Sequence, residues 1–212
     1  MDIFKTLLPG AVVTIQLTVF SALLALALSF LGGLGRLSKV RPVRWVSGFT
    51  IEFFRGTSLL VQLFWLYFAL PLVGIRLPTG LVGILALGIN YGAYGAEVVR
   101  GAIQSIPKGQ HEAGIALNMT PFQRMRYIIL PQAFRTMIPS FGNLMIELLK
   151  GTALVALITI PDMTYEAYTL RNSMEEYTFQ IFGILLLLYF LIGYPLTLFM
   201  RWLERKFSVG RV

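Results

Sequence analysis

The chain has 212 residues, of which 56% are hydrophobic and only 13% are charged, and its mean hydropathy is +0.72. A water-soluble core of this size cannot bury so much apolar material, and the composition therefore predicts an integral membrane protein. One histidine and no cysteine exclude disulfides, thiol chemistry and most zinc or haem sites, and the net charge of +8 fits cytoplasmic loops better than nucleic-acid binding.

Five segments are apolar enough to cross a membrane as helices, which need roughly 20 mostly apolar residues because their backbone must satisfy its own hydrogen bonds in lipid. They cover residues 7–35, 56–75, 77–97, 136–161 and 177–200. The first is too long for a cleaved signal peptide, so we expect it to be retained. The sequence predicts an all-α, single-domain protein over residues 1–212 with five transmembrane helices.

Basic residues are distributed unevenly between the connecting segments. Five Lys or Arg residues lie in 36–55, five in 100–135 and four in 201–211, whereas the alternate segments carry Lys5, Arg76 and Arg171. Cytoplasmic loops of membrane proteins carry an excess of Lys and Arg. We therefore expect a multi-pass protein with its amino terminus outside and its carboxyl terminus in the cytoplasm.

The cytoplasmic segment 104–134 begins with a predicted helix after Pro107, which can open a helix. Ala113, Ala116 and Leu117 then fall on one narrow face at helical spacing. Asn118 is expected to end this helix, because asparagine is second only to glycine in the left-handed position just past a helix.

A second helix is predicted directly after it. Thr120 is suited to the N-cap, Pro121 to the first helical position and Gln123 to the third, which is a capping-box pattern. Two short helices joined at Asn118, with Gly109, Ala113 and Gly114 keeping one surface low, would form a compact knob that docks into another protein. The alternative is an ordinary loop on the inner leaflet, with Arg124 and Arg126 near lipid phosphates.

Charged residues inside the spans are candidates for a transport path, because they are costly in lipid and usually face a bundle interior or a wet cavity. Asn143, Glu147 and Lys150 in the fourth span are spaced to share one helix face. Asn90 and Glu97 lie in the third span. A structural interpretation also stands: Glu147 and Lys150 neutralise each other, and Glu97 pairs with Arg100 near the interface. Gly88, Gly92 and Ala96 form a ridge of small residues that favours close helix packing.

Several stretches carry a resemblance to a known family. EVVRGAIQSIPKGQ at 97–110 and HEAGIALNMTPFQRMRYIILPQAF at 111–134 resemble the Glu-Ala-Ala loop of ATP-binding cassette (ABC) importer permeases. The Ile-Leu-Pro-Gln-Ala ending is similar to the polar amino-acid uptake branch of these permeases. RGTSLLVQLFWLYF at 55–68 and FGNLMIELLKGTALVALI at 141–158 extend the resemblance over nearly the whole chain.

The sequence departs from the family pattern at a few positions. Gly114 replaces the second alanine of the motif and Asn118 replaces a glycine, which preserves small size or the capacity to turn. Ser58 stands where proline commonly follows Arg-Gly-Thr, so the role of residues 55–58 is left open, with an amphipathic approach to the second span as their structural interpretation. Family members often carry a carboxylate where Leu144 stands, one turn from Glu147.

The resemblance implies that segment 104–134 sits in a cleft of a separate ATPase. The implied coupling residues are Glu112, Ala113, Gly114, Asn118 and Pro121. The chain lacks the Gly-x-x-x-x-Gly-Lys-Ser/Thr motif that holds ATP phosphates, so no cofactor is expected in this chain, and ATP and Mg²⁺ would be bound by the ATPase. The chain itself is therefore not expected to be an enzyme.

The other implied partners are a second permease chain, identical or homologous, on an ABC ATPase dimer in a bacterial inner membrane, and an external solute-binding protein. The outer segment 162–176 has four carboxylates and one arginine and would form part of the docking face for that protein. An acidic outer loop is also unremarkable under the positive-inside rule.

The function predicted is that of the permease subunit of an ATP-driven importer for a small polar solute, either a polar amino acid or a related zwitterion. Basic amino acids, glutamine and ectoine-type solutes all remain open. The alternatives are a secondary transporter or channel driven by an ion gradient, which would usually show internal repeats, and a membrane scaffold without transport. Copurification of an ATPase distinguishes the importer from both.

Overall fold

The computed structural model describes residues 3–208, which form helices joined by turns, without a β-strand among them. In chain order the helices are α1 (Ile3–Arg36), α2 (Arg41–Gly56), α3 (Leu59–Phe64), α4 (Thr79–Gln104), α5 (Lys108–Ala116), α6 (Pro121–Arg124), α7 (Leu130–Gly151), α8 (Met163–Ser173) and α9 (Thr178–Ser208). Short π-helical or 3-10 turns extend them, namely η1 (Trp65–Ala69), η2 (Leu70–Val73), η3 (Met125–Ile129), η4 (Thr152–Ile158) and η5 (Glu175–Tyr177). The predicted all-α fold is confirmed.

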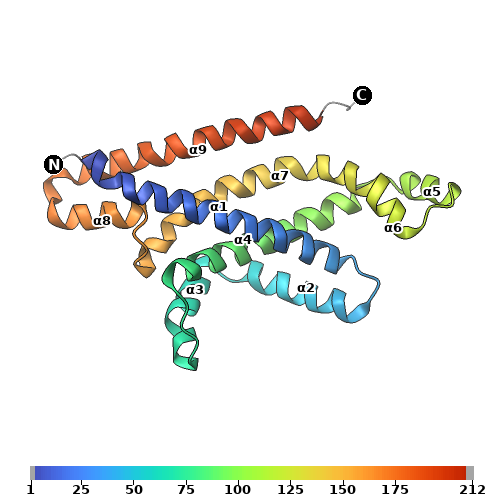
Figure 1. Ribbon diagram of the computed structural model, residues 1–212, viewed down its shortest axis with the longest axis horizontal. Coiled ribbons are helices and arrows are strands. Elements are labelled where there is room, and N and C mark those ends of the chain that lie inside the picture. The colour runs from blue at the N-terminus through green and yellow to red at the C-terminus, as the bar shows by residue number, and fades with distance from the viewer. Residues whose placement is uncertain (1–2, 209–212) are drawn as a thin grey trace.

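The long helices α1, α4, α7 and α9 run along the long axis of the molecule, whereas α3 turns away from them (Figure 1). The helix α8 lies at the end where α1 begins, and α5 and α6 project at the other end (Figure 1). The turn from α1 to α2 and the carboxyl end of α9 also point toward the α5 end, so the three basic segments gather there. Residues 209–211 of the basic segment 201–211 lie outside the described residues.

Four helical stretches are long and apolar enough to cross a membrane: Ile3–Arg36, Thr79–Gln104, Pro121–Ile158 and Glu175–Phe207. A fifth crossing requires that Arg41–Gly56 and Leu59–Val73, which meet at a bend of 102°, count as one. The five predicted spans are thus found with one difference: the second crossing joins Leu59–Val73, within the predicted span 56–75, to α2, which lies in the predicted loop 36–55. α2 is amphipathic, and its apolar side exposes Trp45, Phe49 and Phe53. Its charged side lowers the mean hydropathy of the segment, so the sequence did not predict a membrane helix there.

The prediction of two short helices in segment 104–134 also needs correction. The second helix does not end in the loop, because helical structure continues from Pro121 to Ile158. Pro131 falls within it, directly after a wider turn in which the Leu130 N–H donates to the Met125 carbonyl, five residues back. A loosened turn of this kind lets a helix pass a residue that lacks an N–H group.

Small residues bring α1 and α4 into the largest helix–helix contact among residues 3–208. A Cβ atom on Gly92 would lie 2.8 Å from Leu28, and one on Gly33 would lie 2.7 Å from the Ala96 carbonyl oxygen. The close approach also lets the Ser29 hydroxyl of α1 donate a hydrogen bond to the Gly92 carbonyl of α4 at 3.3 Å. The predicted packing role of the Gly88, Gly92 and Ala96 ridge is confirmed.

Among the residues that the structure describes, the core comprises three clusters spaced along the bundle. The cluster at the α8 end joins α1, α8 and α9, the middle one joins α1, α3, α4 and η4, and the one at the α5 end joins α4, η3 and α7. Large apolar side chains also cover the outside, with exposed fractions of 71% for Leu31, 75% for Leu186 and 89% for Phe179. Such an exterior suits contact with lipid.

The bend between α2 and α3 would leave backbone carbonyls unsatisfied in lipid, and side chains satisfy them. The Gln62 amide donates to the Phe54 carbonyl at 2.9 Å and to the Thr57 hydroxyl at 2.7 Å. Asn90 of α4 donates to the same Phe54 carbonyl at 3.3 Å and to the Gln62 side-chain oxygen at 3.2 Å. This network holds the bend against α4.

Candidate coupling loop and transport path

The turn after α5 has the geometry expected for Asn118, whose φ is 53°. The Asn118 N–H donates to the Ile115 carbonyl at 2.9 Å, and the Met119 N–H donates to the Gly114 carbonyl at 3.0 Å. These two bonds form a Schellman motif, which satisfies the last carbonyls of a helix and reverses the chain. The predicted left-handed turn at Asn118 is confirmed.

The start of the next helix is also as expected. The Thr120 hydroxyl accepts a hydrogen bond from the Gln123 N–H at 3.3 Å, and the Gln123 side chain accepts one from the Thr120 N–H at 2.8 Å. Pro121 occupies the first helical position, where its missing N–H costs nothing. The predicted capping box is confirmed, and it fixes the direction in which the chain leaves the turn.

The outer surface of the loop combines one carboxylate with apolar side chains. Glu112 and Ala113 are exposed. Gly114, by contrast, is buried, and a Cβ there would lie 2.8 Å from the side chain of Arg124. Gly114 therefore sets how closely α5 packs on the following helix. Three apolar side chains on this surface are more than half exposed, namely Ile115, Leu117 and Phe122.

The three polar residues predicted on one face of the fourth span are all exposed on α7: Asn143, Glu147 and Lys150. The Glu147 carbonyl accepts a hydrogen bond from the Tyr91 hydroxyl of α4 at 2.9 Å. Lys150 lines a groove of about 880 Å³ between α7 and α9, together with apolar residues such as Leu149 and Leu186. No ion pair joins Glu147 to Lys150 within residues 3–208.

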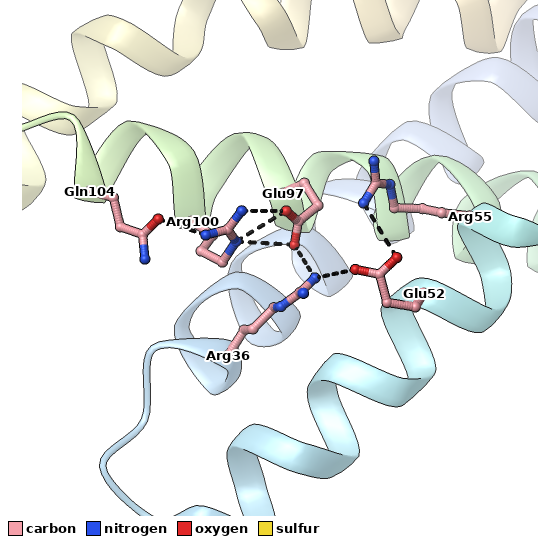
Figure 2. Close-up of polar contacts among 6 residues, drawn as sticks. All are labelled: Arg36, Glu52, Arg55, Glu97, Arg100 and Gln104. Carbon is pink, nitrogen blue, oxygen red and sulfur yellow. Dashed lines mark hydrogen bonds and ion pairs between the residues drawn. The ribbon is translucent and has the colours of Figure 1, made fainter.

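Asn90 and Glu97 belong to α4 and bond to residues of α1, α2, α3 and α4. Asn90 is only 4% exposed and its amide supports the bend between α2 and α3. Glu97 accepts hydrogen bonds from Arg100, as the sequence predicted, and also from Arg36 of α1, 61 positions earlier (Figure 2). Nothing in the local spacing could have indicated the contact with Arg36.

Glu97 belongs to a network of charged residues from α1, α2 and α4 (Figure 2). Arg36 bridges the carboxylates of Glu97, at 2.5 Å, and Glu52, at 2.9 Å. Arg100 approaches Glu97 at 2.8 Å, whereas Arg55 approaches Glu52 only at 3.9 Å. The network joins three guanidinium groups to two carboxylates and ties α2 to the other two helices.

The acidic residues of the outer segment 162–176 differ in how far they are buried. Asp162 is fully buried at the start of α8, where its carboxylate accepts a bond from the Tyr165 N–H at 2.9 Å and one from the Tyr189 hydroxyl at 3.4 Å. Burial raises the pKa of Asp162 to about 6. Glu175 and Glu176 are exposed. Asp162 is therefore a structural residue, and the exposed acidic surface of this segment is smaller than predicted.

Within residues 3–208, no group of three or more His, Cys, Asp or Glu residues could hold a metal ion. The family described as "Binding-protein-dependent transport system inner membrane component" matches residues 24–209. The chain belongs to this family. The resemblance to ABC importer permeases, predicted from the loop motifs, is confirmed, and the family match favours it over a gradient-driven transporter, a channel or a scaffold.

Individual members of the family agree with this assignment. The probable amino-acid ABC transporter permease protein y4tF of Sinorhizobium fredii (strain NBRC 101917 / NGR234) is 49% identical over 208 residues, covering 95% of this chain and 87% of the relative. The L-cystine transport system permease protein TcyB of Bacillus subtilis (strain 168) is 36% identical, over 93% of this chain and 84% of the relative. A solved amino acid ABC transporter with histidines aligns with a TM-score of 0.89 at 33% identity, over 95% of this chain and 94% of the other.

Proposed function

We propose that this permease chain carries a polar amino acid or a related zwitterion across the inner membrane, driven by an ABC ATPase dimer that binds ATP and Mg²⁺. An external binding protein delivers the solute, and a second permease chain completes the path. The amino terminus faces outward and the carboxyl terminus faces the cytoplasm, which is supported by the gathering of basic segments at the α5 end. The names of the relatives support an amino acid as the solute.

The observation that carries the proposal is the projecting α5–α6 loop. Its residues Glu112, Ala113, Gly114, Asn118 and Pro121 lie in a tightly capped helix–turn–helix, and the same loop exposes the Glu112 carboxylate and three large apolar side chains. Large apolar side chains exposed together on one short capped loop favour an interaction site. We assign this surface to the cleft of the ATPase, which would sense ATP binding through it.

The exposed face of α7 supports the presence of a second permease chain. Asn143, Glu147 and Lys150 would be costly against lipid, so they require a wet cavity or another protein surface. A second chain facing this side of α7 would enclose such a cavity and make it the solute path. Asn90 and Glu97 support the opposite wall by fixing α2 against α4.

The test is reconstitution with the ATPase and the binding protein in proteoliposomes. Glu112→Lys should leave the permease inserted but lower ATPase copurification and stimulated ATP hydrolysis, because reversed charge opposes docking. Glu175→Lys is the matched control for ATPase copurification, since it reverses an exposed carboxylate of the outer segment, far along the chain from the loop. Undiminished hydrolysis with Glu112→Lys would place docking elsewhere, and a complex that lacks any ATPase would contradict the importer itself.

A further inference from the structure

Two tyrosines on α4 connect helices that flank it. Tyr91 and Tyr94 are three residues apart, so they lie on the same side of the helix, offset by about 4.5 Å along its axis. The Tyr91 hydroxyl donates to the Glu147 carbonyl of α7 at 2.9 Å, and the Tyr94 hydroxyl donates to the Arg55 carbonyl of α2 at 3.3 Å. This side of α4 therefore has the backbone of Glu147 at one edge and the backbone of Arg55 at the other.

The charged network beside this face has one positive charge in excess, with three guanidinium groups against two carboxylates. Arg36 and Arg100 both meet a carboxylate oxygen within 2.9 Å. Arg55 is held more loosely, 3.9 Å from Glu52. An incompletely neutralised cation in a membrane protein requires an anion or water.

The surroundings of Arg55 leave it able to take an anion. Its guanidinium carbon lies 5.5 Å from the centre of the Tyr94 ring, and stacking of this kind leaves the edge N–H groups free. The Nε atom is buried and has no hydrogen-bond partner among the described residues. The side chain is 33% exposed, and Tyr94 is 39% exposed. A planar carboxylate is the anion that a guanidinium edge binds best.

We propose that Arg55 binds the α-carboxylate of the transported amino acid, while Glu147 at the other edge of the tyrosine face meets its ammonium group. The proposal rests on the proposed function, and it assigns the contact with the carboxylate to Arg55 and not to Lys150, the cation predicted on the path. Lys150 lines the apolar groove between α7 and α9, whereas Glu147 is bonded through its carbonyl to α4. The cation and the carboxylate thus come from different helices, with α4 between them.

The experiment uses the reconstituted complex and measures uptake and ATP hydrolysis in the same proteoliposomes. Uptake of labelled L-arginine, L-glutamine and L-cystine is first measured with the wild type. The amino acid that the wild type accumulates is then the substrate in all assays of the variants. Arg55→Gln should lower uptake per ATP hydrolysed by about tenfold, as expected for loss of a charge-assisted contact. Arg55→Lys, which keeps the charge but lacks the planar fork, should lower it by about threefold.

Arg100→Gln is the matched control, because it removes the same charge from the same network at a residue that contacts Glu97 and Gln104 instead of Tyr94. Its uptake per ATP should stay within about twofold of the wild type. An equal loss of uptake per ATP in Arg55→Gln and Arg100→Gln would overturn the proposal, because it would show that Arg55 has only a structural role. Unchanged uptake per ATP in both Arg55 variants would also overturn it. A wild type that hydrolyses ATP yet accumulates none of the three amino acids would instead refute the proposed function.

Discussion

Substituting alanine for Gly33 tests the packing of α1 on α4, on which the rest of the bundle is built. A Cβ atom at this position would lie 2.7 Å from both the Ala96 carbonyl oxygen and the Val99 Cβ. Ordinary contact begins at 3.4 Å, so the two helices would have to separate by about 0.7 Å. Because one of the obstructing atoms is backbone, a rotamer change cannot relieve the clash.

Overpacking of this kind lowers the free energy of unfolding by about 1–3 kcal/mol. The higher helix propensity of alanine over glycine offsets this loss by up to about 1 kcal/mol. Because the clash involves backbone, the cost lies in the upper part of that range, about 2–3 kcal/mol, so Gly33→Ala should lower the free energy of unfolding by a net of about 1–2 kcal/mol. The matched control is Gly101→Ala on α4, where a Cβ would meet no atom within 4 Å and only the propensity gain remains.

The assay is thermal unfolding of the purified permease in detergent, followed by intrinsic fluorescence and by size-exclusion recovery after heating. Gly33→Ala should melt below the wild type and Gly101→Ala at or slightly above it. If Gly33→Ala melted at the same temperature as Gly101→Ala, the close approach of α1 and α4 would be refuted.

Three further predictions follow from the charges and their surroundings. In this cysteine-free chain, a cysteine at Lys108 should be labelled only from the cytoplasmic side and one at Glu175 only from outside, and reversed labelling would contradict the topology. Because burial raises the pKa of Asp162 from 3.8 to about 6, the folded chain binds the proton more tightly, and stability should fall by about 3 kcal/mol as pH rises through this range. Asp162→Asn should remove that pH dependence from the melting temperature, and an unchanged slope would argue against it. Glu147→Gln should impair uptake while ATPase assembly survives, and near-normal uptake by Glu147→Gln with Lys150→Met would show instead that neither charge contacts the solute.

The sequence alone determined the features that depend on neighbouring residues. The lengths of the apolar segments predicted the long helices, because a membrane-spanning backbone must satisfy its own hydrogen bonds. The turn at Asn118 and the capping box at Thr120 were predictable because their hydrogen bonds connect residues three to five positions apart. The ridge from Gly88 to Ala96 was visible as a repeat of small residues at helical spacing.

The tertiary structure decided which polar groups meet, and this could not be read from local spacing. Asn90 resembles a path residue in the sequence, and its amide donates to the Phe54 carbonyl at the bend between α2 and α3 and to the Gln62 side chain. Glu97 has a local partner in Arg100, but its contact with Arg36 exists because α1 and α4 run side by side. Contacts of this kind depend on how closely whole helices approach and at what angle they bend, since a charge or an amide in low dielectric is stabilised by any partner that packing brings within reach.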